Sequence, residues 1–199
     1  AGYTTGLVGK WHLGYPAAFH PNKRGFDWFF GCLQGARSYF PYTGEPHPHR
    51  VLQENGRPTK ETGYVTDRLG DAACRFIGEH RDESFYLFVS FTAPHGPLHA
   101  KPDHLKKLAG IPMGKRRRYA GLVVSLDENV GKILECLKSH KLEGRTLVVF
   151  TNDNGGQTQT GANNQPLRGR KGQLWEGGIR VPCAMRWPGR IEAGSVIDD

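Results

Sequence analysis

Residues 146–156 read TLVVFTNDNGG, an apolar run that changes abruptly into amide, carboxylate and glycine residues. The apolar part predicts a β-strand, because short runs rich in valine and phenylalanine are typical of buried strands. Asp153 and Asn154 follow at its carboxyl end, where open α/β sheets place their ligands. Their side-chain oxygens suit a hard cation, and the glycines allow the sharp turn that such a site needs. Alone, an Asp-Asn-Gly-Gly segment is more often a simple turn.

The segment that follows is rich in positive charge. Arg168, Arg170 and Lys171 lie within four residues, and the pair Gly177–Gly178 comes soon after them. A metal-binding loop followed by cations indicates a site for an oxyanion ester, either phosphate or sulfate, held between a metal and a lysine. The ordinary alternative for such a charge cluster is a solvated loop.

Two other segments place polar side chains after expected strands. Residues 84–91 form a continuous apolar run, which predicts a strand buried on both faces, and His95 follows it between two prolines. Residues 1–14 end in GKWHLG, and Leu7 and Val8 indicate the end of another strand. Lys10 and His12 lie two residues apart, so they point to the same side of an extended chain.

The order of the expected elements defines the fold class. Residues 63–81 and 116–139 carry apolar side chains at helical spacing, and residues 179–187 predict a last strand. Strands that alternate with amphipathic helices predict an α/β fold with a largely parallel sheet, whose strand ends lie on one edge and can form one crevice. Residues 15–60 predict an irregular region, and their 43–60 part an exposed excursion.

Composition limits the possible partners. The net charge of +8 attracts polyanions of any kind, so it does not choose among nucleic acid, anionic lipid and sulfated polysaccharide. The run Lys115–Arg118 predicts a solvated helix start. No apolar run approaches the ~20 residues of a membrane span. The four cysteines contain no C-x-x-C motif, which excludes a zinc knuckle or dithiol motif and leaves their pairing open.

Together these blocks resemble the type I sulfatases, formylglycine-dependent enzymes of the alkaline-phosphatase superfamily. Residues 2–14 (GYTTGLVGKWHLG) resemble the second signature of that family, and residues 93–98, 151–156 and 169–171 resemble its later active-site blocks. The segments NGGQT, NNQPLRGRK and LWEGG are most similar to arylsulfatase B. The resemblance implies an alkaline-phosphatase-like α/β/α sandwich that hydrolyses an aryl or carbohydrate sulfate ester, including those derived from glycosaminoglycans.

The resemblance also implies how the sulfate is bound. Asp153 and Asn154 would be two ligands of one calcium ion that contacts the sulfate oxygens. Lys10 and Lys171 would neutralise the charge that grows as the S–O bond breaks, because a dianionic transition state requires fixed cations. Asn164 would be a further contact with the substrate.

The two histidines receive acid–base roles from the same resemblance. His12 would act on the aldehyde-hydrate nucleophile and assist the elimination that releases sulfate. His95 would bind the bridging oxygen and protonate the leaving alcohol as a general acid.

Two family features have no counterpart in the sequence. No cysteine or serine lies in the Cys/Ser-x-Pro/Ala-x-Arg motif that carries the nucleophile. The aspartates that complete the calcium site are also absent, and calcium takes six to eight oxygens. In the family both precede the Lys-Trp-His block. We therefore expect residues 1–199 to be the central part of a catalytic domain, lacking the nucleophile segment and the smaller C-terminal domain.

Other interpretations stay open at this stage. A phosphatase or phosphonate hydrolase of the same superfamily would use a similar crevice, although the Lys-Trp-His-Leu-Gly block favours sulfate. A non-catalytic module could instead bind polyanions through residues 115–118 and 168–171. We predict no nucleic-acid partner, leave the oligomeric state open, and take periplasmic, secreted or lysosomal localisation from the resemblance alone.

Overall fold

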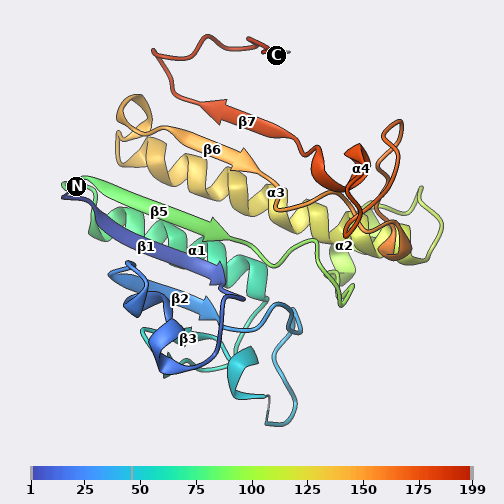
Figure 1. The fold of residues 1–199 in the computed structure, drawn as a ribbon, viewed down its shortest axis with the longest axis horizontal. Helices are drawn as coiled ribbons and strands as arrows, with labels where there is room; N and C mark the ends of the chain where they lie inside the picture. Colours follow the sequence, from blue (N-terminus) through green and yellow to red (C-terminus); the bar gives the residue numbers. More distant parts are fainter. Residues whose placement is uncertain (1, 46, 198–199) are drawn as a thin grey trace.

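The computed structural model describes residues 2–45 and 47–197, and its main sheet has the strand order β4-β3-β2-β1-β5 (Figure 1). The three strands β1 (Thr4–Lys10), β2 (Trp28–Cys32) and β5 (Phe85–Ser90) run parallel. Their register pairs Val8 with Phe30 on one side and with Val89 on the other. The mixed α/β fold with a mostly parallel central sheet is thus confirmed.

The remaining strands pair antiparallel. The short strands β3 (Gln53–Glu54) and β4 (Arg57–Pro58) extend the main sheet beside β2. A second sheet pairs β6 (Val148–Thr151) with β7 (Cys183–Arg186). The strand predicted before the Asp-Asn-Gly-Gly segment is therefore present, but it does not pair with the parallel strands within the described residues.

Both long helices, α1 (Val65–Glu79) and α3 (Lys115–Ser139), lie behind the strands in the view of Figure 1. Val8 and Phe30 of the sheet pack against Leu69 and Ala73 of α1 in one apolar cluster. Leu137 of α3 packs in another cluster that includes side chains of α1, β5 and β6. Both helix predictions are correct to within two residues at each end.

Shorter helices occupy the connections. Helices α2 (Pro102–Lys107) and α4 (Glu176–Ile179) precede α3 and β7 respectively. Single 3₁₀ turns, which are common as connectors, cover Ala17–Phe19, Pro21–Lys23, Pro48–Arg50, Glu143–Arg145 and Thr158–Thr160. No helix in the described part of the chain is long and apolar enough to cross a membrane.

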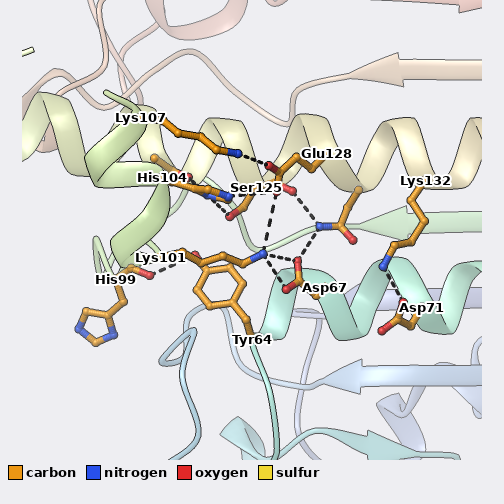
Figure 2. A network of polar contacts seen from close by, with 12 residues as sticks. Tyr64, Asp67, Asp71, His99, Lys101, His104, Lys107, Ser125, Glu128 and Lys132 are labelled. Carbon is orange, nitrogen blue, oxygen red and sulfur yellow. Dashed lines mark hydrogen bonds and ion pairs between the residues drawn. The ribbon is translucent and has the colours of Figure 1, made fainter. Parts of the chain in front are cut away.

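A polar network joins α1, α2 and α3 (Figure 2). Asp67 of α1 accepts hydrogen bonds from Lys101 at 2.8 Å and from Asn129 at 3.0 Å. His104 of α2 is buried and its Nε2 lies 3.0 Å from a carboxylate oxygen of Glu128 on α3. Because buried polar groups are costly without partners, these contacts fix the register of the helices.

Residues 15–60 contradict the prediction of an irregular region. They contain β2, a central strand in which Phe29 is fully buried. The 43–60 part is also less exposed than predicted, since Leu52 is 1% exposed and Gln53 8%; Pro46 lies outside the described residues. The strand was missed because aromatic side chains and glycine give residues 28–32 no clear alternation.

Two strand predictions need smaller corrections. Tyr86 and Phe88 of β5 are 54% and 47% exposed, so in the described structure this strand is covered on one face only. The last strand begins at Cys183 rather than at residue 179, because residues 176–179 form the helical turn α4. A four-residue helix is too short to give a periodic pattern in the sequence.

Candidate active site

Lys10 and His12 lie where β1 ends. Lys10 is the last residue of the strand, and the backbone N–H of His12 donates to the carbonyl oxygen of Leu33 at 3.0 Å. His12 has φ of 59°, which is uncommon for a residue with a side chain and indicates a constrained position. A Cβ on Gly35 would lie 2.4 Å from the His12 ring, so only glycine leaves room for the imidazole there.

His95 lies in the loop after β5. Its backbone carbonyl accepts a hydrogen bond from the Tyr39 hydroxyl at 2.8 Å, and its N–H donates to Thr92 at 2.9 Å. The ring Nδ1 lies 2.8 Å from the carbonyl oxygen of Gly96. Since a carbonyl oxygen only accepts, Nδ1 must carry the proton, and Nε2 remains available for exchange with a ligand.

The two histidines share one cavity. A hollow of about 210 Å³ is lined by His12 and His95 together with Tyr15, Gln34, Gly35 and Ala36. The convergence expected from the strand ends is therefore observed for this pair. A cavity with two imidazoles on its wall can take up and return protons at a bound molecule.

Two lysines influence the pKa of His12, one from the end of the same strand and one from the segment after β6. Burial lowers the pKa of His12 below its ordinary value of 6.5. The charges of Lys10, His95 and Lys171 lower this pKa further. The described structure places His12 and His95 on one cavity, and the charges of Lys10 and Lys171 reach the His12 imidazole. A depressed pKa keeps His12 neutral near pH 7, as a base requires.

Lys171 is attached to the Asp-Asn-Gly-Gly loop through the backbone. Its N–H donates to the carbonyl oxygen of Gly156 at 3.3 Å. Gly155 in turn donates to Gly178 at 2.9 Å, and a Cβ on Gly155 would lie 2.0 Å from the Gly177 oxygen. The paired glycines of both segments thus allow two loops to pack backbone against backbone.

Asp153 and Asn154 follow β6 in a bend of that loop. The Asp153 side chain is exposed, and no hydrogen bond or ion pair involves its carboxylate within the described residues. The Nδ2 of Asn154 donates to the Gly155 carbonyl oxygen at 2.8 Å, and its Oδ1 remains available as an acceptor. These oxygens are of the type that calcium prefers, but two residues cannot supply the six to eight oxygen ligands that the ion takes. Residues 2–45 and 47–197 hold no cluster of three or more acidic, histidine or cysteine ligands.

Asn164 contacts backbone rather than the cavity. Its Oδ1 accepts from the Gly156 N–H at 2.9 Å, and its Nδ2 donates to the carbonyl oxygens of Gly156 and Gly169 at 2.8 and 3.1 Å. One amide side chain therefore ties the loop after β6 to the segment that carries Lys171. Contact with substrate stays a prediction, and this geometry favours a positioning role.

We expect Asn164→Ala to lower kcat/KM about tenfold or more, because a displacement of Lys171 by even 1 Å weakens its contact with the transition state. Asn163→Ala is the matched control, since among the described residues the Asn163 side chain bonds only within its own turn, where it accepts from the Gln165 N–H at 3.0 Å. Steady-state kinetics of both variants measure this difference. Equal kcat/KM values for Asn164→Ala and Asn163→Ala would contradict a positioning role for Asn164.

The pKa of His12 gives a second test of the geometry. Lys10→Ala removes a like charge, so we expect the pKa of His12 to rise toward 6.5. At a pH just below 6.5, more of the imidazole would then be protonated than in the wild type. A ¹³C-histidine NMR titration measures this directly. Lys23→Ala is the control because Lys23 is not among the charges that act on His12, and an unchanged pKa in Lys10→Ala would contradict the site.

The contribution of β2 to the cavity was not predicted from the sequence. Gln34 and Gly35 follow that strand and line the cavity beside His12. The buried Oε1 of Gln34 has no hydrogen-bond partner in the described structure, which makes it a candidate contact for a ligand. The Gln34–Gly35 pair could have indicated this part of the site, because it begins two residues after β2, but β2 itself was not predicted.

The fold and this site define a class: an α/β domain whose strand ends bring two histidines to one cavity. Comparison with known proteins gives the family. The pattern of the family described as Sulfatase matches residues 1–198, and the chain belongs to that family. The resemblance inferred from the sequence blocks is therefore confirmed at family level.

Curated relatives are sulfatases of several names. The chain is 36% identical to arylsulfatase J of Mus musculus over 188 residues, which is 90% of this chain and 31% of that protein. It is 33% identical to N-acetylgalactosamine-6-sulfatase of Homo sapiens over 98% of this chain and 39% of that protein. The chain thus spans less than half the length of these two relatives. The particular resemblance to arylsulfatase B stays a prediction.

Solved structures of related proteins have the same fold as this chain. The structure of Ps i-CgsB in complex with k-i-k-neocarrahexaose superposes with a TM-score of 0.92 at 40% identity, covering 97% of this chain and 46% of that one. The PsFucS1 sulfatase from Pseudoalteromonas sp. gives 0.77 at 28% identity, covering 97% of this chain and 44% of that one.

Proposed function

We propose that the whole protein hydrolyses a sulfate monoester. The observation that carries this proposal is the cavity shared by His12 and His95, together with the charges of Lys10 and Lys171, which lower the pKa of His12. Fixed cations stabilise the charge of a departing sulfuryl group without reorganisation during the reaction. Membership of the sulfatase family supports sulfate rather than another oxyanion.

Each residue then has one role. Lys10 and Lys171 bind the sulfate oxygens and the bridging oxygen. In its doubly protonated form, His95 donates the Nε2 proton to the leaving alcohol and becomes neutral, while its Nδ1–H donates to the Gly96 carbonyl oxygen. His12, kept neutral by its depressed pKa, removes a proton at the nucleophile side.

Calcium is the metal that the loop after β6 suits. Asp153 and Asn154 would hold it together with oxygens from sequence outside residues 1–199, which would also supply the formylglycine nucleophile. When bound, the ion would supply positive charge to the sulfate oxygens. We propose the family's exported or lysosomal locations for the whole protein, since residues 1–199 decide none of them.

The substrate is proposed to be an aryl or carbohydrate sulfate. One neighbour supports the carbohydrate class: the Ps i-CgsB structure, which is 40% identical to this chain, contains a k-i-k-neocarrahexaose. Loop residues such as Gln34 would select the particular ester.

The polyanion-binding alternative loses support from the structure. Arg116 donates to the Gly161 carbonyl at 2.8 Å, Arg117 donates to Leu105, and the Arg168 guanidinium stacks 3.7 Å above the Trp175 ring. Several cations of the two basic runs therefore hold loops in place. A free polyanion-binding surface would need these groups to be available.

The proposal is tested by giving the whole protein 4-nitrophenyl sulfate and 4-nitrophenyl phosphate under the same conditions with calcium. We expect kcat/KM for the sulfate to be at least 100-fold higher. A preference for phosphate would replace the proposal with the phosphatase alternative. No turnover of either ester or of sulfated oligosaccharides, with heparin binding retained, would support the non-catalytic module.

A further inference from the structure

Two of the four cysteines face each other across the interface between α1 and α3. Cys74 lies on α1 and Cys136 on α3, 62 residues apart in sequence. The Sγ of Cys136 is 3.6 Å from the Cys74 carbonyl oxygen, and the Sγ of Cys74 is 3.7 Å from the Lys132 carbonyl oxygen. In an α-helix the carbonyl of residue 132 accepts from the N–H of residue 136. Each sulfur therefore points at the backbone that carries the other cysteine.

The register of the helices is set independently of the cysteines. Asn129 bonds to Asp67 at a separation of 62 residues, and Lys132 bonds to Asp71 at a separation of 61. The two helices thus run side by side in the same direction, and Figure 2 shows the Asp71–Lys132 pair between them. Cys74 and Cys136 occupy the next step of this series, about one turn beyond Asp71–Lys132.

We propose that Cys74 and Cys136 form a disulfide that cross-links α1 to α3 in the mature protein. Both are free thiols in the structure and both are partly buried. The other two cysteines are placed differently: Cys32 is buried in the sheet core, and Cys183 is exposed on β7. The pair on the helices is therefore the one that the fold brings together.

The chemistry requires a disulfide oxidant, such as oxidised glutathione. The Cys136 thiolate attacks one glutathione sulfur and releases one glutathione thiolate. The Cys74 thiolate then attacks the mixed disulfide and releases the second. Two protein thiols lose two electrons and two protons, and glutathione disulfide is reduced to two thiols.

Burial and the adjacent Cys136 raise the pKa of Cys74 to about 12. Since only the thiolate reacts, exchange at neutral pH should be slow. The reaction is therefore to be equilibrated at a pH of about 8.5 to 9, where the reactive fraction is larger.

The test is peptide mapping of the whole protein after equilibration with oxidised glutathione. Free thiols are blocked with iodoacetamide in denaturant, and the protein is digested with trypsin without reduction. Cleavage after lysine and arginine places Cys74 in peptide 69–75 and Cys136 in peptide 133–138. Cys32 and Cys183 fall in peptides 25–37 and 181–186 and serve as internal controls.

We expect one linked species that joins peptides 69–75 and 133–138 and separates on reduction. Oxidation should also raise the Tm by several degrees, since a cross-link over 62 residues restricts the unfolded chain. Cys74→Ser and Cys136→Ser should each abolish this shift, whereas Cys183→Ser should keep it. Both peptides recovered as separate alkylated thiols, or either one linked to a different cysteine, would overturn the proposal.

Discussion

Replacing Lys171 with alanine is expected to lower kcat/KM for a sulfate monoester by roughly 100- to 1000-fold, the range seen when one fixed group that stabilises developing charge is removed. The charge of this lysine lowers the pKa of His12, which lines the cavity. Its charge stabilises the transition state more than the bound substrate, so the substitution should lower mainly kcat rather than raise KM. Steady-state kinetics of the whole protein with 4-nitrophenyl sulfate measure this.

Arg170→Ala is the matched control for that experiment. It removes the same charge from the neighbouring residue of the same loop, yet Arg170 is not among the groups that act on His12. We expect Arg170→Ala to stay within about threefold of the wild-type rate. Equal losses in the two variants would mean that loop charge in general, rather than Lys171, supports catalysis.

His95→Ala is expected to lower turnover by about 100- to 10,000-fold for esters of poorly acidic alcohols, the usual contribution of a general acid. An aryl leaving group of low pKa needs no proton, so the loss should shrink as leaving-group acidity increases. A series of substituted aryl and alkyl sulfates therefore gives a steeper dependence of log kcat/KM on leaving-group pKa in the variant.

His99→Ala controls for loss of an imidazole in the same loop. The Nδ1 of His99 lies 3.3 Å from the Ser38 hydroxyl, and its carbonyl accepts from Tyr64. We expect its leaving-group dependence to match the wild type. Parallel lines for wild type and His95→Ala would show that His95 transfers no proton to the leaving group.

Long periodic segments were predictable from the sequence. The apolar stripe of residues 116–139 predicted α3, which the structure places at Lys115–Ser139. The strand β2 was not predictable in the same way, because Trp28–Cys32 is short and its burial depends on pairing with β1. Strand pairing between distant segments cannot be read from local propensity.

The site was predictable only in part, for a related physical reason. Residues at or soon after the ends of recognisable strands, such as Lys10 and His95, were identified from the rule that parallel strands end at one edge. Gln34 was missed because its strand was missed. The backbone contacts of Asn164 were also invisible, since they depend on how the loop after β6 folds against the Lys171 segment.

The most direct test of the account is the release of inorganic sulfate from a sulfated oligosaccharide, an ester of a poorly acidic alcohol, by the whole protein and its site variants, measured by ion chromatography in the presence of calcium. The variants are Lys10→Ala, His12→Ala, His95→Ala, Asp153→Ala and Lys171→Ala, with Arg170→Ala and His99→Ala as controls. Sulfate release should fall at least 100-fold in each site variant and stay near the wild-type rate in both controls. Wild-type release from His95→Ala and Lys171→Ala would contradict the assignment of this crevice as a sulfatase site.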